Sequence, residues 1–560
     1  MRKTLLLIAS LFAISMFGET SVAFDWAKTA TLGSSKQTTA QQPLALSNGN
    51  VISVFTTTGS SDFKINGESI DLKDEGTTIS PSNIVFSNIS ADGTMNWIFN
   101  SVRGGVSFNA GSLAEIPGKD LAVAAFSVRY NKVADTAEEL VKFIDAKGNP
   151  FSIKMECPSA YNPYEGVLLT FKPSTGEIVS LSKIESEHSV AGKNIAQTLY
   201  INGVAATEKG FYITGYAYSD VTFPGNVKFT PSKGVPSDWN GSTAIGNGFT
   251  ALFSVDGTCS KVVESNVTSD VREGNYLIRS TDNQIFVIGM SNSSLLYFNY
   301  DSELKLLNSS VLPFSDASNG SHNALLKKLD VTPGCAYVSG HLAGGFEGTD
   351  IKTSGTSGNQ FGFVIKIDRS TATITGGGVE DAMISGYYGA YENEADNTLY
   401  AIGYNMNQKI AFVQPYTSDW EKKDRITLFT TTGTPALWPT EFNGVNNSLL
   451  LPGRSNQKAV LGDVTIAEGF TAFSGFLAKY SFNDFKLADV SETIADAITS
   501  PISVRGTVGQ VIVSSSVPAT VNIYNISGSL VRSVNVNAGE TAIDLNAGFY
   551  IAAGSKVIVR

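Results

Sequence analysis

Few side chains in this sequence could do chemistry. The 560 residues include only three histidines, His188, His322 and His341, and these would hold a metal ion only if the fold brought them together. Glu347 and Asp350 follow His341 closely enough to complete such a site. Isolated polar residues in loops are the plainer interpretation, so we expect no metal site.

Catalytic motifs are equally scarce. Glu380 and Asp381 could act as an acid/base pair, but adjacent residues rarely point to one substrate. Gly246-x-Gly248 lacks the third glycine of a nucleotide-binding motif, and Gly376-Gly377-Gly378 lies in a predicted loop with no helix after it, so we interpret both as turn glycines. The sequence also lacks a Gly-x-Ser-x-Gly elbow, a His-Glu-x-x-His helix and a Cys-x-x-Cys pair. We therefore predict no catalytic residue and no cofactor.

Charge and cysteine content narrow the classes of function further. The formal net charge is −11, from 40 Lys and Arg against 51 Asp and Glu, which argues against a nucleic-acid partner. Cys157, Cys259 and Cys335 lie far apart, and three buried small hydrophobic residues are the preferred interpretation. One disulfide with a free thiol remains the alternative.

The N-terminus predicts export. Residues 1–23 begin with Arg2 and Lys3, continue as a mostly apolar run from Leu5 to Phe17, and end in Ser21-Val22-Ala23. This is the pattern of a secretory signal peptide, and the apolar run is too short to span a bilayer. We expect a secreted protein without a transmembrane segment, at the cell surface or associated with an outer membrane.

Two short phrases recur along residues 24–489. The first is an aromatic or apolar residue followed three positions later by a glycine that closes a strand-like run, after a polar turn. Its five copies are Tyr212-Ile213-Thr214-Gly215, Phe286-Val287-Ile288-Gly289, Tyr337-Val338-Ser339-Gly340, Tyr400-Ala401-Ile402-Gly403 and Leu450-Leu451-Pro452-Gly453.

The second phrase is an apolar run that precedes another tight turn. Its clearest copies begin at Gly166, Gly248, Gly362 and Gly475, and weaker ones begin at Ile84, Leu295 and Ile410. Two hairpins repeated seven times predict an all-β fold, a seven-bladed β-propeller over residues 24–489. A row of independent β-sandwiches is the alternative, but it would show linkers between regular units.

The repeat resembles secreted β-propeller repeat proteins of Bacteroidetes, in which a blade carries a phrase such as Gly-Phe-x-x-Lys-x-Asp. Phe363 to Asp368 and Phe476 to Tyr480 are the nearest matches, and the resemblance extends over most of residues 44–489. Residues 104–163 depart from it, and residues 136–144 could form a helix. Residues 24–28 look like an outer strand at the wrong end of the chain, so we predict that the N-terminus completes the last blade.

A separate module follows a small and polar linker, residues 490–500. Residues 501–560 hold six short alternating runs, at 508–513, 520–524, 530–536, 542–545, 549–552 and 557–559, which predict a small antiparallel β-sandwich. With Val521-Asn522-Ile523-Tyr524 and the ending Lys556-Val557-Ile558-Val559-Arg560, it resembles the C-terminal sorting domain of the type IX secretion system. That resemblance implies recognition by the outer-membrane secretion machinery. A related domain of other role and a merely stabilising sandwich stay open, since the usual Pro-Asn-Pro opening is missing.

Loop lengths point to a contact face. Within a propeller blade the two tight turns lie on one face, whereas the long connections, such as residues 216–247 and 342–360, lie on the other. Trp239, Tyr387 and Tyr388 fall in these connections, where exposed rings could stack on sugars or on a protein. Aromatic plugs that pin the loops are the alternative.

The preferred function is therefore an exported propeller that binds a glycan or protein ligand through Trp239, Tyr387 and Tyr388, without enzymatic activity. A propeller glycosidase or polysaccharide lyase, and a purely structural surface component, remain open.

Overall fold

The computed structural model describes residues 21–560 except 33–36, 59–61, 73–82, 104, 108–112, 130–133, 158–163, 188, 191–192, 195–198, 233–245, 266–275, 282, 292, 316–323, 355–359, 384, 434–435, 467–471, 486, 488–501, 516–517, 526–529 and 553–554. The chain separates into two compact units, Met1–Ala488 and Asp489–Arg560. Every regular element in the described ranges is a β-strand. The described residues contain no helix that is long and apolar enough to cross a membrane.

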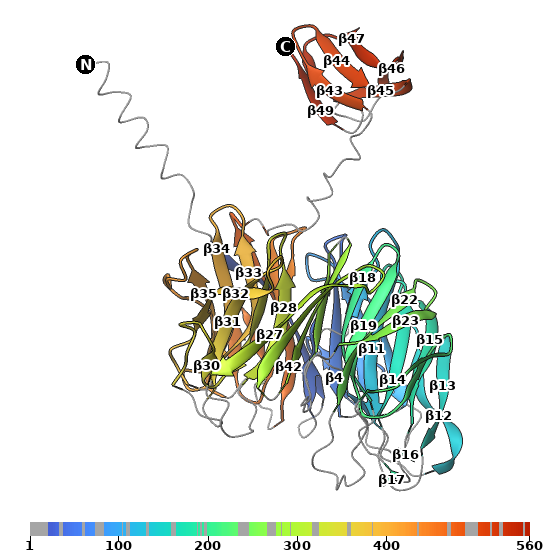
Figure 1. The fold of residues 1–560 in the computed structure, drawn as a ribbon, viewed down its shortest axis with the longest axis vertical. Coiled ribbons are helices and arrows are strands. Elements are labelled where there is room, and N and C mark those ends of the chain that lie inside the picture. The colour runs from blue at the N-terminus through green and yellow to red at the C-terminus, as the bar shows by residue number, and fades with distance from the viewer. Residues whose placement is uncertain are drawn as a thin grey trace, which may run out of the picture. The chain divides into compact units, whose positions relative to one another are not determined.

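The first unit is built from antiparallel sheets (Figure 1). Seven sheets among the described residues each contain a four-strand meander, which we call blades 1 to 7. Blades 1 to 3 consist of β2 (Thr38–Ala40) with β3 (Leu44–Ala45), β4 (Val51–Thr57), β7 (Asn83–Ile89) and β8 (Met95–Arg103); β9 (Gly105–Ser107) with β10 (Leu113–Glu115), β11 (Ala122–Arg129), β14 (Tyr164–Phe171) and β15 (Ile178–Ser186); and β18 (Leu199–Thr207), β19 (Gly210–Ala217), β22 (Asn247–Ser254) and β23 (Cys259–Glu264).

Blades 4 to 7 follow the same order from inner to outer strand. They consist of β24 (Leu277–Ser280), β25 (Gln284–Met290), β26 (Ser294–Asp301) and β27 (Leu306–Ser315); β28 (Ala324–Val331), β29 (Cys335–Leu342), β31 (Phe361–Asp368) and β32 (Thr373–Val379); β33 (Ser385–Asn393), β34 (Thr398–Asn405), β35 (Ile410–Tyr416) and β36 (Ile426–Thr431); and β37 (Ala436–Leu437) with β38 (Glu441–Asn443), β39 (Ser448–Ser455), β42 (Ser474–Asn483) and β1 (Ser21–Leu32).

The two repeated phrases form the second and third strands of the blades, and neighbouring blades cover both faces of these strands. All eight residues of β19 are buried, for example. Seven hydrophobic clusters separate consecutive blades, one at each junction around the ring. A blade cannot bury both faces alone, so stacking around an axis is the arrangement that removes this apolar surface from water.

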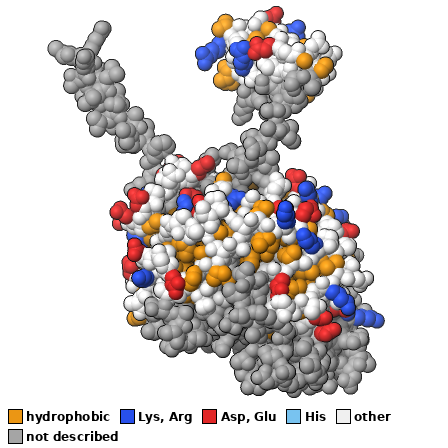
Figure 2. All heavy atoms as spheres, in the orientation of Figure 1, with side chains coloured by type: hydrophobic (Ala, Val, Ile, Leu, Met, Phe, Trp, Pro, Cys, Tyr) orange, Lys and Arg blue, Asp and Glu red, His pale blue; other side chains and the backbone are white. Residues whose placement is uncertain are grey.

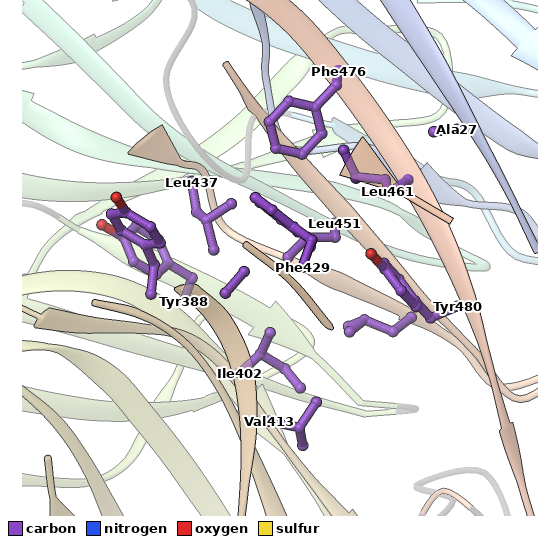
Figure 3. Packing of buried hydrophobic residues seen from close by; sticks show 14 of the residues in the cluster. Ala27, Tyr388, Ile402, Val413, Phe429, Leu437, Leu451, Leu461, Phe476 and Tyr480 are labelled. Atoms are coloured by element: carbon purple, nitrogen blue, oxygen red, sulfur yellow. The ribbon is translucent and has the colours of Figure 1, made fainter. Parts of the chain in front are cut away.

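The junction between blades 6 and 7 illustrates the packing (Figure 3). Tyr388, Ile402 and Val413 of blade 6 face Leu451 and Phe476 of blade 7 across the junction. The ring of Phe429 meets Phe476 edge to face, with centroids 5.7 Å apart. Edge-to-face aromatic pairs of this kind stabilise sheet-on-sheet packing beyond the area that they bury.

Hydrogen bonds join each blade to the next and close the ring. Going around from blade 1, they link the Asn88 amide to the Pro173 carbonyl, the Ile201 N–H to Ser127 Oγ, Ser280 Oγ to the Ala206 carbonyl, Arg279 Nε to the Leu329 carbonyl, the Gly362 N–H to Ser385 Oγ, the Thr440 N–H to the Tyr388 carbonyl, and the Gly475 N–H to Thr38 Oγ1. The sheets therefore share one axis, and the row of detached sandwiches is excluded.

The N-terminal strand completes the last blade, as predicted. Strand β1 pairs with β42 from Ser21 opposite Asn483 to Ala30 opposite Gly475. Asp25 forms an ion pair with Lys479, whose Nζ lies 3.1 Å from Asp25 Oδ2. The Trp26 indole N–H donates to the Ala91 carbonyl of blade 1 at 3.0 Å. The two ends of the ring are thus held together by a shared sheet.

Much of the extra chain length is strand, where the sequence predicted loops. Five insertions between the second and third strands of a blade reach back and pair with the outer strand of the preceding blade. They are β5 (Phe63–Ile65) and β6 (Glu68–Ser69) on β1, β12 (Ala134–Ile144) and β13 (Pro150–Cys157) on β8, β20 (Val221–Phe223) and β21 (Val227–Phe229) on β15, β30 (Gly345–Phe346) on β27, and β40 (Ala459–Leu461) and β41 (Val464–Ile466) on β36.

This pairing corrects the suggested helix at residues 136–144, which belong to strand β12 (Figure 1). The insertions also cover outer strand edges, which otherwise expose unpaired N–H and C=O groups. The predicted difference between the two faces is present in the connections. Those between first and second strands are short, as from Thr207 to Gly210. Those between second and third strands are long in five of the seven blades, as from Ala217 to Asn247, and short in blades 4 and 6, from Met290 to Ser294 and from Asn405 to Ile410.

The side of the first unit seen in Figure 2 carries hydrophobic side chains across its middle and most of its charged side chains nearer the margins. Leu306, Leu307 and Val311 of outer strand β27 are among the exposed large hydrophobic residues.

A short hairpin, β16 (Ser189–Val190) with β17 (Lys193–Asn194), lies between blades 2 and 3 in sequence.

The second unit is a small antiparallel sandwich, as the sequence predicted. One sheet has the order β43 (Ile502–Gly506), β44 (Gln510–Ser515), β47 (Gly539–Asp544), and the other has the order β46 (Leu530–Val536), β45 (Ala519–Asn525), β48 (Gly548–Ala552), β49 (Ser555–Val559). Strand β43 was not among the six predicted runs. Val511 and Val513 of the first sheet pack with Val521 and Ile523 of the second to form its core.

Candidate functional site

Two of the predicted ligand-binding residues do not lie in a loop. Tyr387 and Tyr388 belong to β33, the inner strand of blade 6, and both side chains are buried. Tyr387 Oη lies 2.8 Å from Tyr416 Oη and donates to Glu380 Oε2 at 3.2 Å. The prediction that these rings are exposed for stacking is therefore wrong, because the propeller core uses them. Trp239 lies outside the described residues.

The histidines do not gather into a metal site within the described ranges, which contain no group of three or more His, Cys, Asp or Glu side chains placed to hold a metal. His188 and His322 lie outside the described residues. His341 of β29 is packed between blades 5 and 6, with its Nε2 3.2 Å from Tyr388 Oη. Burial, and then the positive charge of Lys327, lower the pKa of His341 to about 3, so its imidazole is neutral at ordinary pH.

Glu380 and Asp381 point to different partners, so they do not form an acid/base pair. The Glu380 side chain is buried, and both of its oxygens lie 2.8 Å from Arg425 Nη2. Asp381 is exposed and pairs with Lys422 Nζ. Cys259 and Cys335 are free and buried, as expected for small hydrophobic residues, and the Cys157 side chain lies outside the description.

Bulges interrupt the inner strands at one level of the ring. In β18, β28 and β33 the register with the second strand shifts by one residue, and the extra residues are Asn202, Lys327 and Tyr388. Between β37 and β38 three residues, beginning with Trp438, oppose two of β39. A β-bulge re-aims the side chain that it inserts, and bulges are frequent beside binding sites. We call Asn202, Lys327, Tyr388 and Trp438 the bulge belt.

The repeat glycines mark these bulges. Gly215, Gly340 and Gly403 pair with the residue that precedes each bulge. A Cβ on Gly215 would lie 1.9 Å from the Tyr200 carbonyl oxygen, and one on Gly340 would lie 2.1 Å from that of Leu325. Only glycine permits backbones to approach this closely. The first sequence phrase thus pointed to the bulge belt, although the belt itself was not predicted.

An ion network closes the axis of the ring just beyond the belt. Glu441 of blade 7 accepts hydrogen bonds on Oε2 from Arg279 Nη2 of blade 4 at 2.8 Å, from Lys328 Nζ of blade 5 at 2.5 Å and from Gln42 Nε2, next to blade 1, at 3.0 Å. Arg279 also lies 3.8 Å from Asp330 Oδ1. Groups from four blades meet here, so the network crosses the axis.

The two carboxyls of this network ionise differently. Burial opposes ionisation of Glu441, but Arg279 and Lys328 outweigh it and hold the pKa of Glu441 at about 2. Burial raises the pKa of Asp330 to about 6, although Lys328 and Arg279 favour its ionised form. Asp330 Oδ2 is buried without a hydrogen-bond partner in the described structure. The network is therefore anchored on Glu441.

A small cavity lies between the belt and the network. Its wall includes Asn202 and Lys327 of the belt and Gln42, Arg279 and Lys328 of the network. The space is about 10 Å³, which is enough for roughly one water molecule. Every inner strand begins at the face that carries the inter-blade connections and the connections between second and third strands. Along the inner strands the belt residues come before the network residues. The belt therefore lies between this face and the network.

Comparison with known proteins adds little to this geometry. No family model matches the chain, and no curated protein sequence matches it. Among solved structures, the chain is similar to the Dos1 propeller (TM-score 0.37, 11% identity, 83% of this chain and 97% of that one) and to a protein of unknown function from Dyadobacter fermentans (TM-score 0.38, 9% identity, 82% and 99%).

A quinohemoprotein alcohol dehydrogenase from Pseudomonas putida is similar at a TM-score of 0.35 and 10% identity, over 83% of this chain and 76% of that one. Likeness this remote carries no argument about function. The propeller assignment rests on the strand pairing and on the junctions between blades.

Proposed function

We propose that the chain is an exported cell-surface β-propeller that binds a glycan or protein ligand and performs no chemistry on it. The observation that carries this proposal is the unequal pair of faces. One face has tight turns, and the other carries the long connections between second and third strands. Binding residues gather on variable loops held by a rigid scaffold. We therefore assign the contact surface to the face with the long connections.

The state of the buried carboxylates supports binding over catalysis. Glu380 is engaged by Arg425, and Glu441 is engaged by Arg279 and Lys328. A general acid or base must reach a substrate proton directly or through one water. Carboxylates committed to buried cations inside a packed ring serve rigidity instead.

Export and attachment form the second part of the proposal. Residues 1–23 act as a signal peptide, and cleavage after Ala23 would leave Phe24 to Leu32 paired with β42 and β5. The C-terminal sandwich acts as an address for the outer-membrane secretion machinery. Its compact seven-strand form and its own core support a role as an independent module.

A glycan array with the full chain tests the binding role. We expect a defined set of glycans to bind, and Trp239→Ala to weaken that binding without changing the melting temperature. Phe549→Ala, which removes an exposed ring from the other unit, is the matched control and should bind normally. Normal binding by Trp239→Ala would remove Trp239 from the site, and an array without hits, together with no protein captured at the long-connection face, would contradict the proposal.

A fusion tests the address. Residues 490–560 attached to a neutral exported cargo should bring that cargo to the surface of a host with a type IX secretion system. Cargo that stays in the periplasm would contradict the sorting role while leaving the binding role intact.

One observation favours an enzymatic alternative. Asp330 and Glu441 lie in the same axial network with pKa values pushed apart to about 6 and about 2, as in an acid/base pair. The adjoining cavity, at about 10 Å³, is too small for a sugar ring between the two carboxyls. Release of reducing ends from a bound polysaccharide, abolished by Asp330→Asn, would establish this alternative.

A further inference from the structure

Lys327 is a cation without a counter-ion. Its Nζ lies over the Tyr388 ring, 5.5 Å from the centroid, and it has no hydrogen bond or ion pair with any described residue. The adjacent Lys328 is bound by Glu441. Lys366 of the same blade also lies 5.5 Å over a ring, that of Tyr337, but its Nζ is 3.6 Å from Glu392. Lys327 therefore differs from otherwise similar lysines in lacking a carboxylate.

The charges around the cavity leave one positive charge over. Arg279, Lys327 and Lys328 bring three positive charges, and Glu441 and Asp330 bring at most two negative ones. The paired groups already satisfy one another, so the excess charge resides on Lys327. Lys327 is half-buried, and a partly desolvated charge without a counter-ion is unfavourable, so an anionic group at the cavity would relieve this cost.

Asn202, on the same wall of the cavity, requires a hydrogen-bond donor from a ligand. The residue is 8% exposed, and its Oδ1 has no hydrogen-bond partner in the described structure. An amide oxygen can only accept, so the missing partner must be a donor such as a hydroxyl group. Leaving a buried acceptor unpaired costs free energy, which a donor from a ligand would recover.

The size of the cavity limits what enters. Space of about 10 Å³ admits a small functional group and excludes a whole sugar ring. The ligand must present an acidic group with a hydroxyl close by, while its body remains on the side of the long connections. A single excess positive charge suits a monoanion better than a phosphate dianion.

We propose that the cavity between the bulge belt and the axial network is a subsite for the carboxylate of a uronic acid residue. The carboxylate pairs with the Lys327 ammonium, and a neighbouring sugar hydroxyl donates to Asn202 Oδ1. This inference rests on the proposed glycan-binding function and deepens it by naming the substrate class.

Titration of the full chain with D-glucuronate and D-galacturonate, followed by saturation-transfer NMR, tests the subsite. The methyl esters of both sugars keep the shape and remove the charge, so they serve as matched ligands. We expect at least one uronate to bind and its methyl ester to bind at least about tenfold more weakly. Acetate should compete poorly because it lacks the hydroxyl.

Three variants complete the test. Lys327→Met removes the ammonium and should weaken uronate binding about tenfold or more, and Asn202→Leu should weaken it by a smaller factor. Lys366→Met removes a lysine that is already paired and should bind as the wild type does. Melting temperatures identify any variant that fails to fold. If a variant does not fold, the difference in affinity of the wild-type chain for the uronate and for its methyl ester still tests the proposal.

Equal binding of uronate and methyl ester, or unchanged uronate binding in a folded Lys327→Met variant, would overturn the subsite. Acetate that competes as well as uronate would overturn the assignment to Asn202. If neutral glycans bind on the array but uronates do not bind here, the subsite fails and the proposed function stands. Absence of every glycan and protein ligand would remove both.

Discussion

The propeller and the C-terminal sandwich are both built from antiparallel strands, yet they stabilise those strands differently. The propeller distributes its core over seven junctions, joins the junctions into a closed ring and places an ion network on the axis. The sandwich has one small core. Both units leave some large apolar side chains exposed, and those of the sandwich include Phe549 at 64% and Ile558 at 52%.

The difference shows what each unit is built to tolerate. In the ring every blade depends on its two neighbours, so damage at one junction weakens the whole disc. In the sandwich the core alone keeps the fold, and its outer face is free to meet another molecule. Phe549 and Ile558 are register partners on adjacent strands, so they form one continuous apolar spot.

Opening the ring should have the largest effect. A chain that starts at residue 33 lacks β1, the outer strand of blade 7, and loses its pairing with β42 and β5. We expect the propeller to unfold at room temperature, a loss comparable with the stability of a whole domain, about 5–15 kcal/mol. Calorimetry of this chain and of one that starts at residue 24 measures the effect. An unchanged melting temperature would show that the ring does not close through the N-terminus.

Substitutions in the core and on the surface of the sandwich should differ clearly in their effect on its stability. Ile523→Ala creates a cavity at a fully buried position and should cost about 2–5 kcal/mol. Phe549→Thr changes an exposed side chain and should alter stability by no more than about 0.5 kcal/mol. Urea unfolding of residues 489–560 in the full chain, followed by NMR signals of that unit, measures both. Similar costs for the two variants would contradict the distinction drawn here.

Glycine at a bulge should be irreplaceable, whereas a turn glycine of the same blade should not be. Gly340→Ala brings a Cβ to 2.1 Å from the Leu325 carbonyl oxygen and should cost about 1–3 kcal/mol through overpacking. At Gly334 an added Cβ meets nothing within 4 Å, so Gly334→Ala is the control. Chemical denaturation compares the two. Equal stability would mean that the strands near Gly340 can separate without cost.

His341 should give the propeller a modest acid sensitivity. Its pKa is about 3 in the folded chain and near its ordinary value of 6.5 when unfolded. The unfolded chain then binds an extra proton between these values, so stability falls as the pH drops from about 6.5 to about 3. Asp330, with its raised pKa, acts in the opposite sense below pH 6.

The difference between wild type and His341→Gln isolates the contribution of His341. The unfolding free energy of the variant, measured by urea titration from pH 7 to pH 4, should decline less steeply with acid. Parallel pH profiles would mean that His341 titrates normally in the folded protein.

The sequence predicted the propeller because its phrases report strands that are buried on both faces. The phrases at Tyr212 and Gly248 correspond to β19 and β22, the second and third strands of blade 3. The inner strands escaped notice, because a bulge breaks the alternation that marks a strand. Tyr387 and Tyr388 were for this reason assigned to a loop, although they lie on β33.

The second limit on prediction from the sequence was the identity of the segments that pair with one another. Residues 134–144 carry Glu138, Glu139 and Lys142 among apolar residues, a pattern that also suits a helix. What makes them a strand is their pairing with β13 and with β8 of the preceding blade, and local sequence does not contain that information. The axial network escaped for the same reason, since Arg279 and Glu441 are 162 residues apart.

The central claim is that one closed ring brings Glu441 of blade 7 against Arg279 of blade 4 across a shared axis, and a double-mutant cycle between them tests it most directly. Glu441→Gln removes the carboxylate that pairs with both Arg279 and Lys328 and should cost about 3–5 kcal/mol, whereas Arg279→Met leaves Glu441 paired with Lys328 alone and should cost less. The double variant should cost less than the sum by about 1 kcal/mol or more. Strictly additive costs would contradict the contact, and with it the closed ring that creates the axial cavity.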